Sequence, residues 1–387
     1  MTNRERENAT LSFAKDLERG AVAETFFPWD LTAGRWQWEG LPPGLADHLY
    51  PEAPAAAEAY LDCLMTAAVY QFEQFFGFDG VKRISFKLPF LNYPVEEVEA
   101  TAASVVRQDK DGWLRRYYRD SELVEEIKPV VSDEADWRRL KERAVGELER
   151  YYSDANIRRI YDVYRAGQQR GDYSVRLNIG GFFWTPRELL GIEGHLLAFY
   201  DNPEMLHDMN EFILEVYRDR LGRVLDILPA DVLYIMEDLS GVNGPMLSPA
   251  LFDEFVGAYY RRLVPLLKEK GVRHVLVDTD GDFTKLIPNF IRAGIEGFLP
   301  MDVNAGMDIV AVRQSYPDLK FIGGFNKLAI AAGPEAVDAE FARLLPVIRQ
   351  GGYIPGCDHQ VAPSTALADY LYYVDRLKEV MREAGRG

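Results

Sequence analysis

The chain has 387 residues with 44 basic and 61 acidic side chains, which gives a formal net charge of −17. This negative balance disfavours nucleic acids and anionic membranes as partners, because both repel a surface of the same sign. The apolar content of 48% and the aromatic content of 12% are those of a globular protein with a sizeable core.

The cysteine content and the N-terminal segment predict a cytoplasmic protein. Cys63 and Cys357 are the two cysteines, too few for a disulfide framework. The charged N-terminal segment lacks the apolar stretch of a signal peptide, and no apolar run approaches the roughly 20 residues that span a bilayer. We therefore expect a soluble cytoplasmic protein.

The first part of the chain predicts mixed structure around an insertion. Residues 1–20 read as a polar helical arm, and apolar spacing predicts a helix at 54–76 between strands at Thr25–Asp30 and 81–91. Two β-type segments, 98–106 and 113–118, flank a turn signal at 109–112 and predict an inserted β-hairpin at about 96–119. Helices follow at about 132–148, with Ser132 as N-cap, and at 153–170.

The remaining two thirds alternate regularly between strands and helices, which predicts βαβ units and a parallel sheet. The expected strands are 174–180, 232–237, 274–278, 297–301, 320–324 and 352–355. The expected helices are 203–227, 249–270, 283–293, 307–315, 334–350 and 366–384. With the two early strands the count is eight, which favours one (β/α)8 TIM barrel over residues 1–387, in the α/β class. The absence of a Gly-x-Gly-x-x-Gly motif after any of these strands counts against a dinucleotide-binding fold.

Polar residues follow most of these strands, at the end where a barrel carries its active site. The strongest stretch is Val275–Asp282, in which an apolar run ends in Asp278, Asp280 and Asp282. Aspartates at such a position can simply cap the following helix. Two carboxylates at i and i+2 would instead face the same side and repel each other unless a cation or a shared proton relieved them. The other strand ends contribute Glu237, Asp238, Asp302, Asn304, Asn326, Lys327, Cys357, Asp358 and His359, and the glycines Gly180 and Gly181 precede Phe182 and Trp184.

His359 is the histidine whose position points most clearly to chemistry, because it lies in a turn after a strand. Together with Asp278, Asp280 and Glu237 it would form a mixed oxygen and nitrogen site that suits zinc or another divalent ion. Cys357 is either a further ligand or a small buried filler. Glu237 reads equally as a cap or an ion-pair residue, and Asn326 as a turn residue.

Several stretches resemble the uroporphyrinogen decarboxylase superfamily. They are Trp36–Pro42, Gly244–Pro249, Val277–Asp282, Gly323–Lys327 and, most specifically, Gly351–Pro363. The resemblance implies an eight-stranded barrel with its cleft at the strand C-terminal ends and a possible homodimer. It also implies an enzyme, since the superfamily contains porphyrinogen decarboxylases and zinc-dependent methyltransferases that act with corrinoid proteins.

The motifs depart from both branches of that superfamily. The decarboxylases carry Met-Arg-Gln-Ala-Gly-Arg-Tyr near the first strand, where this chain reads Phe27–Trp36, and their second-strand aspartate has no match in Arg83–Pro89. The methyltransferases use His-x-Cys at the fifth strand and a Cys in the last turn. The matching positions here are Asp278-x-Asp280 and His359 or Cys357, a similar layout with harder ligands.

On this resemblance we expect a metal-dependent methyltransferase that passes a methyl group from a small O- or N-methylated compound to a corrinoid protein. Glu237, Asp278 and His359 would be catalytic, with Asp278, Asp280, His359 and Glu237 holding the metal. Trp36, Phe182, Trp184, Asn326 and Lys327 would bind the substrate. The alternatives are a decarboxylase-like carboxy-lyase acting on another acidic or tetrapyrrole-like substrate, and a corrinoid or porphyrin carrier.

Overall fold

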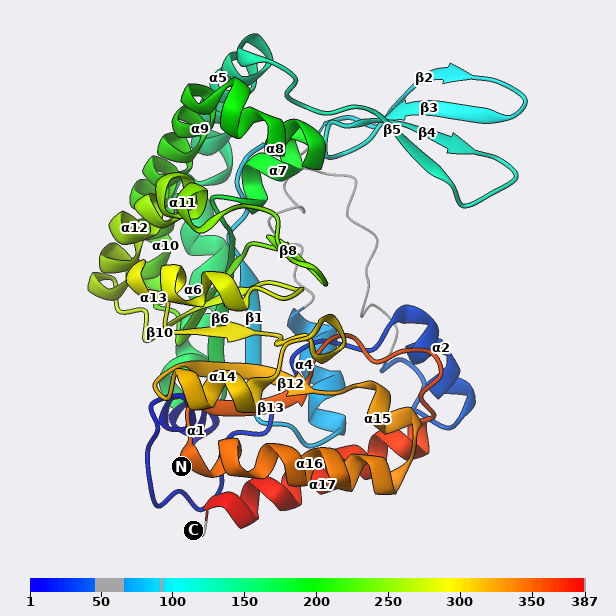
Figure 1. Ribbon diagram of the computed structural model, residues 1–387, viewed down its shortest axis with the longest axis vertical. Coiled ribbons are helices and arrows are strands. Elements are labelled where there is room, and N and C mark those ends of the chain that lie inside the picture. The colour runs from blue at the N-terminus through cyan, green and yellow to red at the C-terminus, as the bar shows by residue number, and fades with distance from the viewer. Residues whose placement is uncertain (46–65, 91–92, 386–387) are drawn as a thin grey trace.

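A computed structural model describes residues 1–45, 66–90 and 93–385, and its frame is a curled parallel sheet (Figure 1). Within the described residues this sheet has seven strands in the order β1-β6-β7-β10-β11-β12-β13. Their bounds are β1 Val81–Ser85, β6 Ser174–Gly180, β7 Val232–Met236, β10 His274–Asp278, β11 Gly297–Leu299, β12 Lys320–Phe325 and β13 Tyr353–Cys357. All neighbours pair in parallel, so every strand delivers its C-terminal end to one face. This is the TIM-barrel-like α/β fold that the strand count predicts.

The interior of the barrel is a layer of apolar side chains contributed by strand after strand. Six strands and one adjoining segment supply a small cluster separate from the main core, which contains Ala23, Val81, Val232, Leu276, Leu299, Ile322 and Ile354. Because side chains alternate along a strand, Asp278 faces the same side as Leu276, one layer nearer the C-terminal end.

The prediction of a strand at Thr25–Asp30 is wrong, but the segment does lie where the eighth strand of the barrel is expected. The segment from Ala21 to Phe27 is buried and lies between β1 and β13, where an eighth strand would run. One backbone bond joins it to the residues before β1, from the N–H of Asp79 to the Val22 carbonyl at 2.8 Å. Side chains make the other contacts: Cys357 N donates to the Glu24 carboxylate at 2.6 Å, and Arg83 donates to the Glu24 carbonyl at 2.6 Å. Pro28 has no N–H to give a ladder, and a helix, α2 Asp30–Trp38, begins two residues later.

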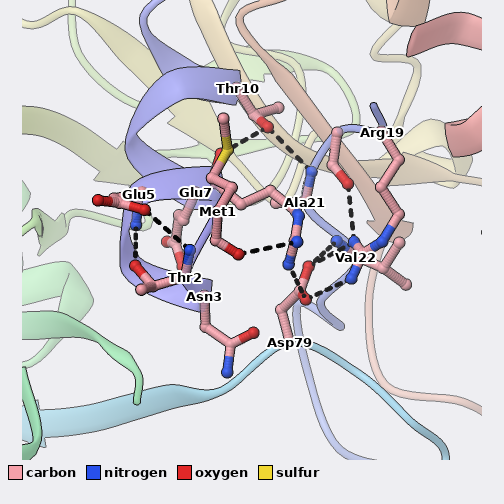
Figure 2. A network of polar contacts seen from close by, with 12 residues as sticks. Met1, Thr2, Asn3, Glu5, Glu7, Thr10, Arg19, Ala21, Val22 and Asp79 are labelled. Atoms are coloured by element: carbon pink, nitrogen blue, oxygen red, sulfur yellow. Dashed lines mark hydrogen bonds and ion pairs between the residues drawn. The ribbon is translucent and has the colours of Figure 1, made fainter. Parts of the chain in front are cut away.

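The N-terminal arm is tied to this closing segment by one buried carboxylate, Asp79 (Figure 2). Asp79 accepts hydrogen bonds from Arg6, from Arg19 and from the backbone N–H of Val22. The arm forms the helix α1 Asn3–Leu11, whose Thr2 N-cap and Glu5 make a capping box. The last two residues of α1 are buried, and Thr10 accepts from the N–H of Ala21. The arm is therefore part of the barrel's closure.

Helices surround the sheet, and most lie where their apolar spacing predicts. The remaining helices are α4 Thr66–Phe75, α5 Glu134–Tyr151, α6 Asp154–Arg170, α7 Trp184–Leu190, α8 Ile192–Asp201, α9 Pro203–Val216, α10 Gly222–Ile227, α11 Pro249–Phe252, α12 Ala258–Glu269, α13 Ile287–Arg292, α14 Ile309–Ser315, α15 Leu328–Ala331, α16 Pro334–Gln350 and α17 Leu367–Gly385. The predicted helices 203–227 and 249–270 each contain a π-helical turn, at 217–221 and 253–257. Residues 54–65 of the predicted helix 54–76, together with Cys63, lie outside the described residues.

The insertion is larger than the predicted hairpin. It is a four-stranded antiparallel sheet of β2 Glu96–Ala100, β3 Ser104–Gln108, β4 Leu114–Tyr118 and β5 Val124–Lys128, which stands out from the barrel (Figure 1). Trp113 anchors it, because its indole N–H donates to the Glu188 carbonyl at 2.8 Å. The outer strands β2 and β5 are fully exposed and carry little of the alternation that would reveal them in the sequence. None of the helices in the described part of the chain combines the length and apolar character needed to cross a bilayer.

Candidate active site

The C-terminal end of β10 buries one carboxyl group that has no hydrogen-bond partner in the described chain. Asp278 is 4% exposed, and its backbone carbonyl accepts from the N–H of Glu237. Burial raises its pKa well above the usual range, and the neighbouring carboxylates of Asp238 and Asp280 raise it further. Burial and the neighbouring carboxylates therefore both favour the protonated form of Asp278.

Asp280 and His359 meet across the mouth of the barrel. The Nε2 atom of His359 lies 3.7 Å from Oδ2 of Asp280, and Oδ1 of Asp280 is buried without a hydrogen-bond partner in the described residues. Burial raises the pKa of Asp280 to about 7, with further contributions from the carboxylates of Asp238 and Asp302. Gly281 makes the turn that follows, with φ of +77°, because a Cβ there would overlap the backbone at Ser240. The site thus contains a carboxyl group that exchanges its proton near neutral pH.

Two aromatic rings that the sequence reasoning missed flank His359. The ring of Phe26 lies 5.1 Å from the imidazole and that of Trp29 lies 6.4 Å from it. Burial lowers the pKa of His359, and the positive charge of Lys327 lowers it further, which favours the neutral imidazole. Phe26 is half-buried and Trp29 is 45% exposed. The apolar stretch at Thr25–Asp30 does not show by itself that these rings reach the last turn of the barrel.

Asp358 holds three neighbouring strand ends together and brings Lys327 to the site. Its buried carboxylate accepts from the N–H of Val303 at 3.1 Å, from the Asn304 amide at 2.9 Å and from the N–H of Lys327 at 3.0 Å. The Lys327 ammonium is 3.7 Å from the same carboxylate. Asn326 is a turn residue, since its side-chain oxygen accepts from the N–H of Leu328 at 3.0 Å.

The structure does not bring the Glu237 side chain to the other three predicted metal ligands. It is fully buried and accepts from the N–H groups of residues 182, 183 and 184 and from the Tyr260 hydroxyl. Burial raises its pKa to about 7 against the opposing effect of these donors. Gly181 is required beside it, because a Cβ there would overlap the Glu237 carboxyl group. Glu237 is positioned to hold the loop after β6.

The predicted substrate-binding aromatics divide into core and cleft. Trp36 is fully buried, donates to the Thr365 carbonyl and packs on Tyr370, so it belongs to the core. Phe182 is 1% exposed and packs among tyrosines. Trp184 is half-buried and lines a cavity at the strand ends.

The Cys357 thiol is directed into the main core. Burial and the nearby Glu24 carboxylate raise its pKa, and Tyr373 is its hydrogen-bond partner. This geometry supports the interpretation of Cys357 as a buried filler.

A divalent ion does not fit the predicted ligands as they are placed. In the described residues no three carboxylate, imidazole or thiol side chains converge as a metal site requires. Asp280 and His359 are close to each other, but Glu237 has its oxygens engaged elsewhere. The metal therefore remains a prediction, which elemental analysis of protein purified without chelator tests.

Comparison with known proteins places this barrel and its strand-end site in a family. Residues 126–380 match the model of the family described as Uroporphyrinogen decarboxylase (URO-D). The chain belongs to the URO-D family. Uroporphyrinogen decarboxylases from two strains of Caulobacter vibrioides are 25% identical over 179 residues, which is 46% of this chain and 49% of theirs. The chain thus aligns with about half the length of these curated relatives.

A methyltransferase from Methanosarcina mazei shares the fold of this URO-D family member. Its structure aligns with a TM-score of 0.56 at 13% sequence identity, over 98% of this chain and 99% of that one. At this identity the likeness concerns the fold alone. The shared fold covers nearly the whole chain, including the part before residue 126 that the family model leaves out.

Proposed function

We propose that this URO-D family member is a methyltransferase that moves a methyl group from a small O- or N-methylated compound to a corrinoid protein. The observation that carries the proposal is the Asp280–His359 pair at the strand ends, 3.7 Å apart, in which Asp280 has a pKa of about 7. A general acid is most effective when its pKa lies near the working pH.

Asp280 would donate a proton to the heteroatom that loses the methyl group. When the methyl group leaves an ether oxygen, the electron pair of the broken bond stays on that oxygen, which then needs a proton. Protonated Asp280 supplies it, and the carboxylate that remains takes a new proton from solvent, which the neighbouring imidazole of His359 can relay. The reduced corrinoid of the partner protein would supply the nucleophile, so the chain's own task is to position the substrate and stabilise the leaving group.

The charge around the pair favours a neutral or cationic substrate over a polycarboxylate. The side chains of Asp238, Asp278, Asp280, Asp302 and Asp358 all contribute to the electrostatics of this end of the barrel, against the single cation Lys327 among the groups that act on Asp280. A substrate with several carboxylates would be repelled wherever these groups are ionised.

Decarboxylation is the second candidate, supported by the similarity to the Caulobacter decarboxylases. Loss of carbon dioxide leaves a carbanion, which a neutral acid such as Asp280 can protonate. The two candidates use the same acid but differ in what leaves the substrate.

The test is an assay for both reactions with free reduced cobalamin in place of the partner protein. We expect methylcobalamin to form, detected by absorbance, with a panel of methyl ethers and methylamines. His359→Ala should lower the rate at least tenfold. His207→Ala should leave the rate unchanged, because His207 lies on α9 and its ring bonds to Tyr259 on α12. Carbon dioxide release from uroporphyrinogen without any methyl transfer would replace this proposal with the second candidate.

A further inference from the structure

A cavity of about 220 Å³ opens at the C-terminal ends of β1, β6 and β7. Its apolar walls are Phe86, Leu88, Phe90, Trp184, Leu189 and Met236. Four polar side chains complete the lining: Lys87, Asn178, Thr185 and Glu188. Concave, mostly apolar sites with a few polar groups are the usual form of small-molecule pockets.

The strand register places this cavity directly beside the acid cluster. Met236 of β7 is paired with Gly180 of β6 on one side and with Asp278 of β10 on the other. Neighbouring strands are about 5 Å apart, so the cavity wall at Met236 lies beside Asp278, two residues before the proposed acid Asp280. The cavity and the acids are therefore two parts of one barrel mouth.

The walls of the cavity are held in place by residues behind them. Phe86 stacks on Tyr152 with ring centroids 4.5 Å apart, and Phe90 packs edge-on against Trp137 at 5.9 Å. The Tyr152 hydroxyl also bonds to both backbone groups of Lys87, which fixes the loop after β1.

Trp184 is braced in a similar way, since the Arg187 guanidinium lies 4.9 Å above its ring and also donates to the Asp238 carbonyl at 2.6 Å. A site whose walls are already fixed loses little conformational entropy on binding.

We infer that this cavity binds a single aromatic ring, so that the methyl donor is an aryl methyl ether or an N-methylated arylamine. The inference rests on the proposed function, which identifies the methylated oxygen or nitrogen as the end of the substrate that reacts. An apolar cavity of about 150 Å³ accommodates benzene, so the volume here suits one substituted ring and is small for a tetrapyrrole. Aromatic walls favour a flat ring through offset and edge-to-face contacts.

Binding of methoxybenzene, compared with cyclohexyl methyl ether, tests the inference by isothermal titration without any turnover. The two ethers have similar size and the same ether oxygen, and differ in the flatness of the ring. We expect methoxybenzene to bind more tightly. Trp184→Ala should weaken its binding about 3- to 10-fold, Trp184→Phe should restore most of the affinity, and Leu88→Trp should block the cavity. Trp38→Ala removes an indole that is 94% exposed and is the matched control.

Equal affinity for the two ethers, or affinity unchanged in both Trp184→Ala and Leu88→Trp, would overturn the inference. Thermal unfolding of each variant identifies one that has lost its fold, and quenching of Trp184 fluorescence in the wild type, absent in Trp184→Phe, reports occupancy independently. Ring binding without methyl transfer to cobalamin would keep the cavity assignment and remove the proposed function. Methyl transfer without ring binding in this cavity would keep the proposed function and remove the cavity assignment.

Discussion

Asp278 and Asp280 are two residues apart, yet the barrel gives them different chemistry. Asp278 lies inside the barrel with no hydrogen-bond donor in the described chain, so its neutral form is strongly favoured. Asp280 is at the mouth, closer to solvent, with His359 3.7 Å away and Lys327 lowering its pKa against the neighbouring acids. The Asp280 proton is thus available near neutral pH, whereas burial among carboxylates holds the pKa of Asp278 well above its usual range.

This difference predicts a pH dependence for the proposed methyl transfer. Because the pKa of Asp280 is raised to about 7, its protonated form is lost as the pH rises through 7, and kcat/KM for an ether substrate should fall above that pH. Asp280→Asn should lower kcat/KM about 100-fold or more and abolish this descending limb. Asp282→Asn, the same change two residues away at a turn, should leave the profile as it is. A wild-type profile that stays flat from pH 6 to 9 would exclude Asp280 as the acid.

At the scale of elements, the loop between β6 and α7 depends on Glu237 of the next strand. Three consecutive N–H groups at the start of α7 point at one carboxyl group, which compensates donors that a helix N-terminus leaves unsatisfied. Sequence reasoning gave Glu237 a role in catalysis because it follows a strand, but alternation turns it away from the side that carries Met236. Glu237 affects the cavity indirectly, because its carboxylate accepts from the N–H of Trp184, whose side chain lines that cavity.

Glu237→Gln should therefore destabilise the protein and disturb the cavity. The amide NH₂ would face two N–H donors, and an unsatisfied buried polar contact costs about 1–3 kcal/mol. Urea unfolding should show this loss, and methoxybenzene binding should weaken with it. Glu193→Gln, the same change at an exposed position on α8, should stay within about 0.5 kcal/mol of the wild type. An unchanged unfolding free energy for Glu237→Gln would show that the carboxylate is not needed there.

At the scale of the whole molecule, side chains complete the barrel where strands do not. The segment 21–27 connects β1 and β13 through Glu24 and Asp79, and α1 is attached to the same place (Figure 2). Asp79 is 4% exposed and binds two arginines of the arm. Removing one partner of such a buried network leaves the remaining charges uncompensated.

Asp79→Asn should accordingly destabilise the fold by about 3–5 kcal/mol. The free energy of urea unfolding measures this, with Asp16→Asn, at an exposed site in the same arm, as the control. A loss below 1 kcal/mol would mean that the closing segment is held mainly by its apolar contacts.

The sequence alone determined the periodic part of this protein. The expected strands 174–180 and 274–278 coincide with β6 and β10, since buried parallel strands read as apolar runs and each is followed by turn residues. The same reading found Asp278, Asp280 and His359, because the carboxyl ends of parallel strands meet at one face.

Tertiary structure alone decided what each residue does at that face. Which side of a strand end a carboxylate faces depends on its neighbours. Glu237 therefore accepts hydrogen bonds from backbone N–H groups, while Asp280 lies beside His359. Trp36 was assigned to the substrate by its resemblance motif and lies in the core, whereas Phe26 and Trp29 were read as a strand and lie beside His359. The physical reason is that spacing fixes local geometry, but burial, the partner of each polar group and therefore its pKa arise only from contacts between segments distant in the chain.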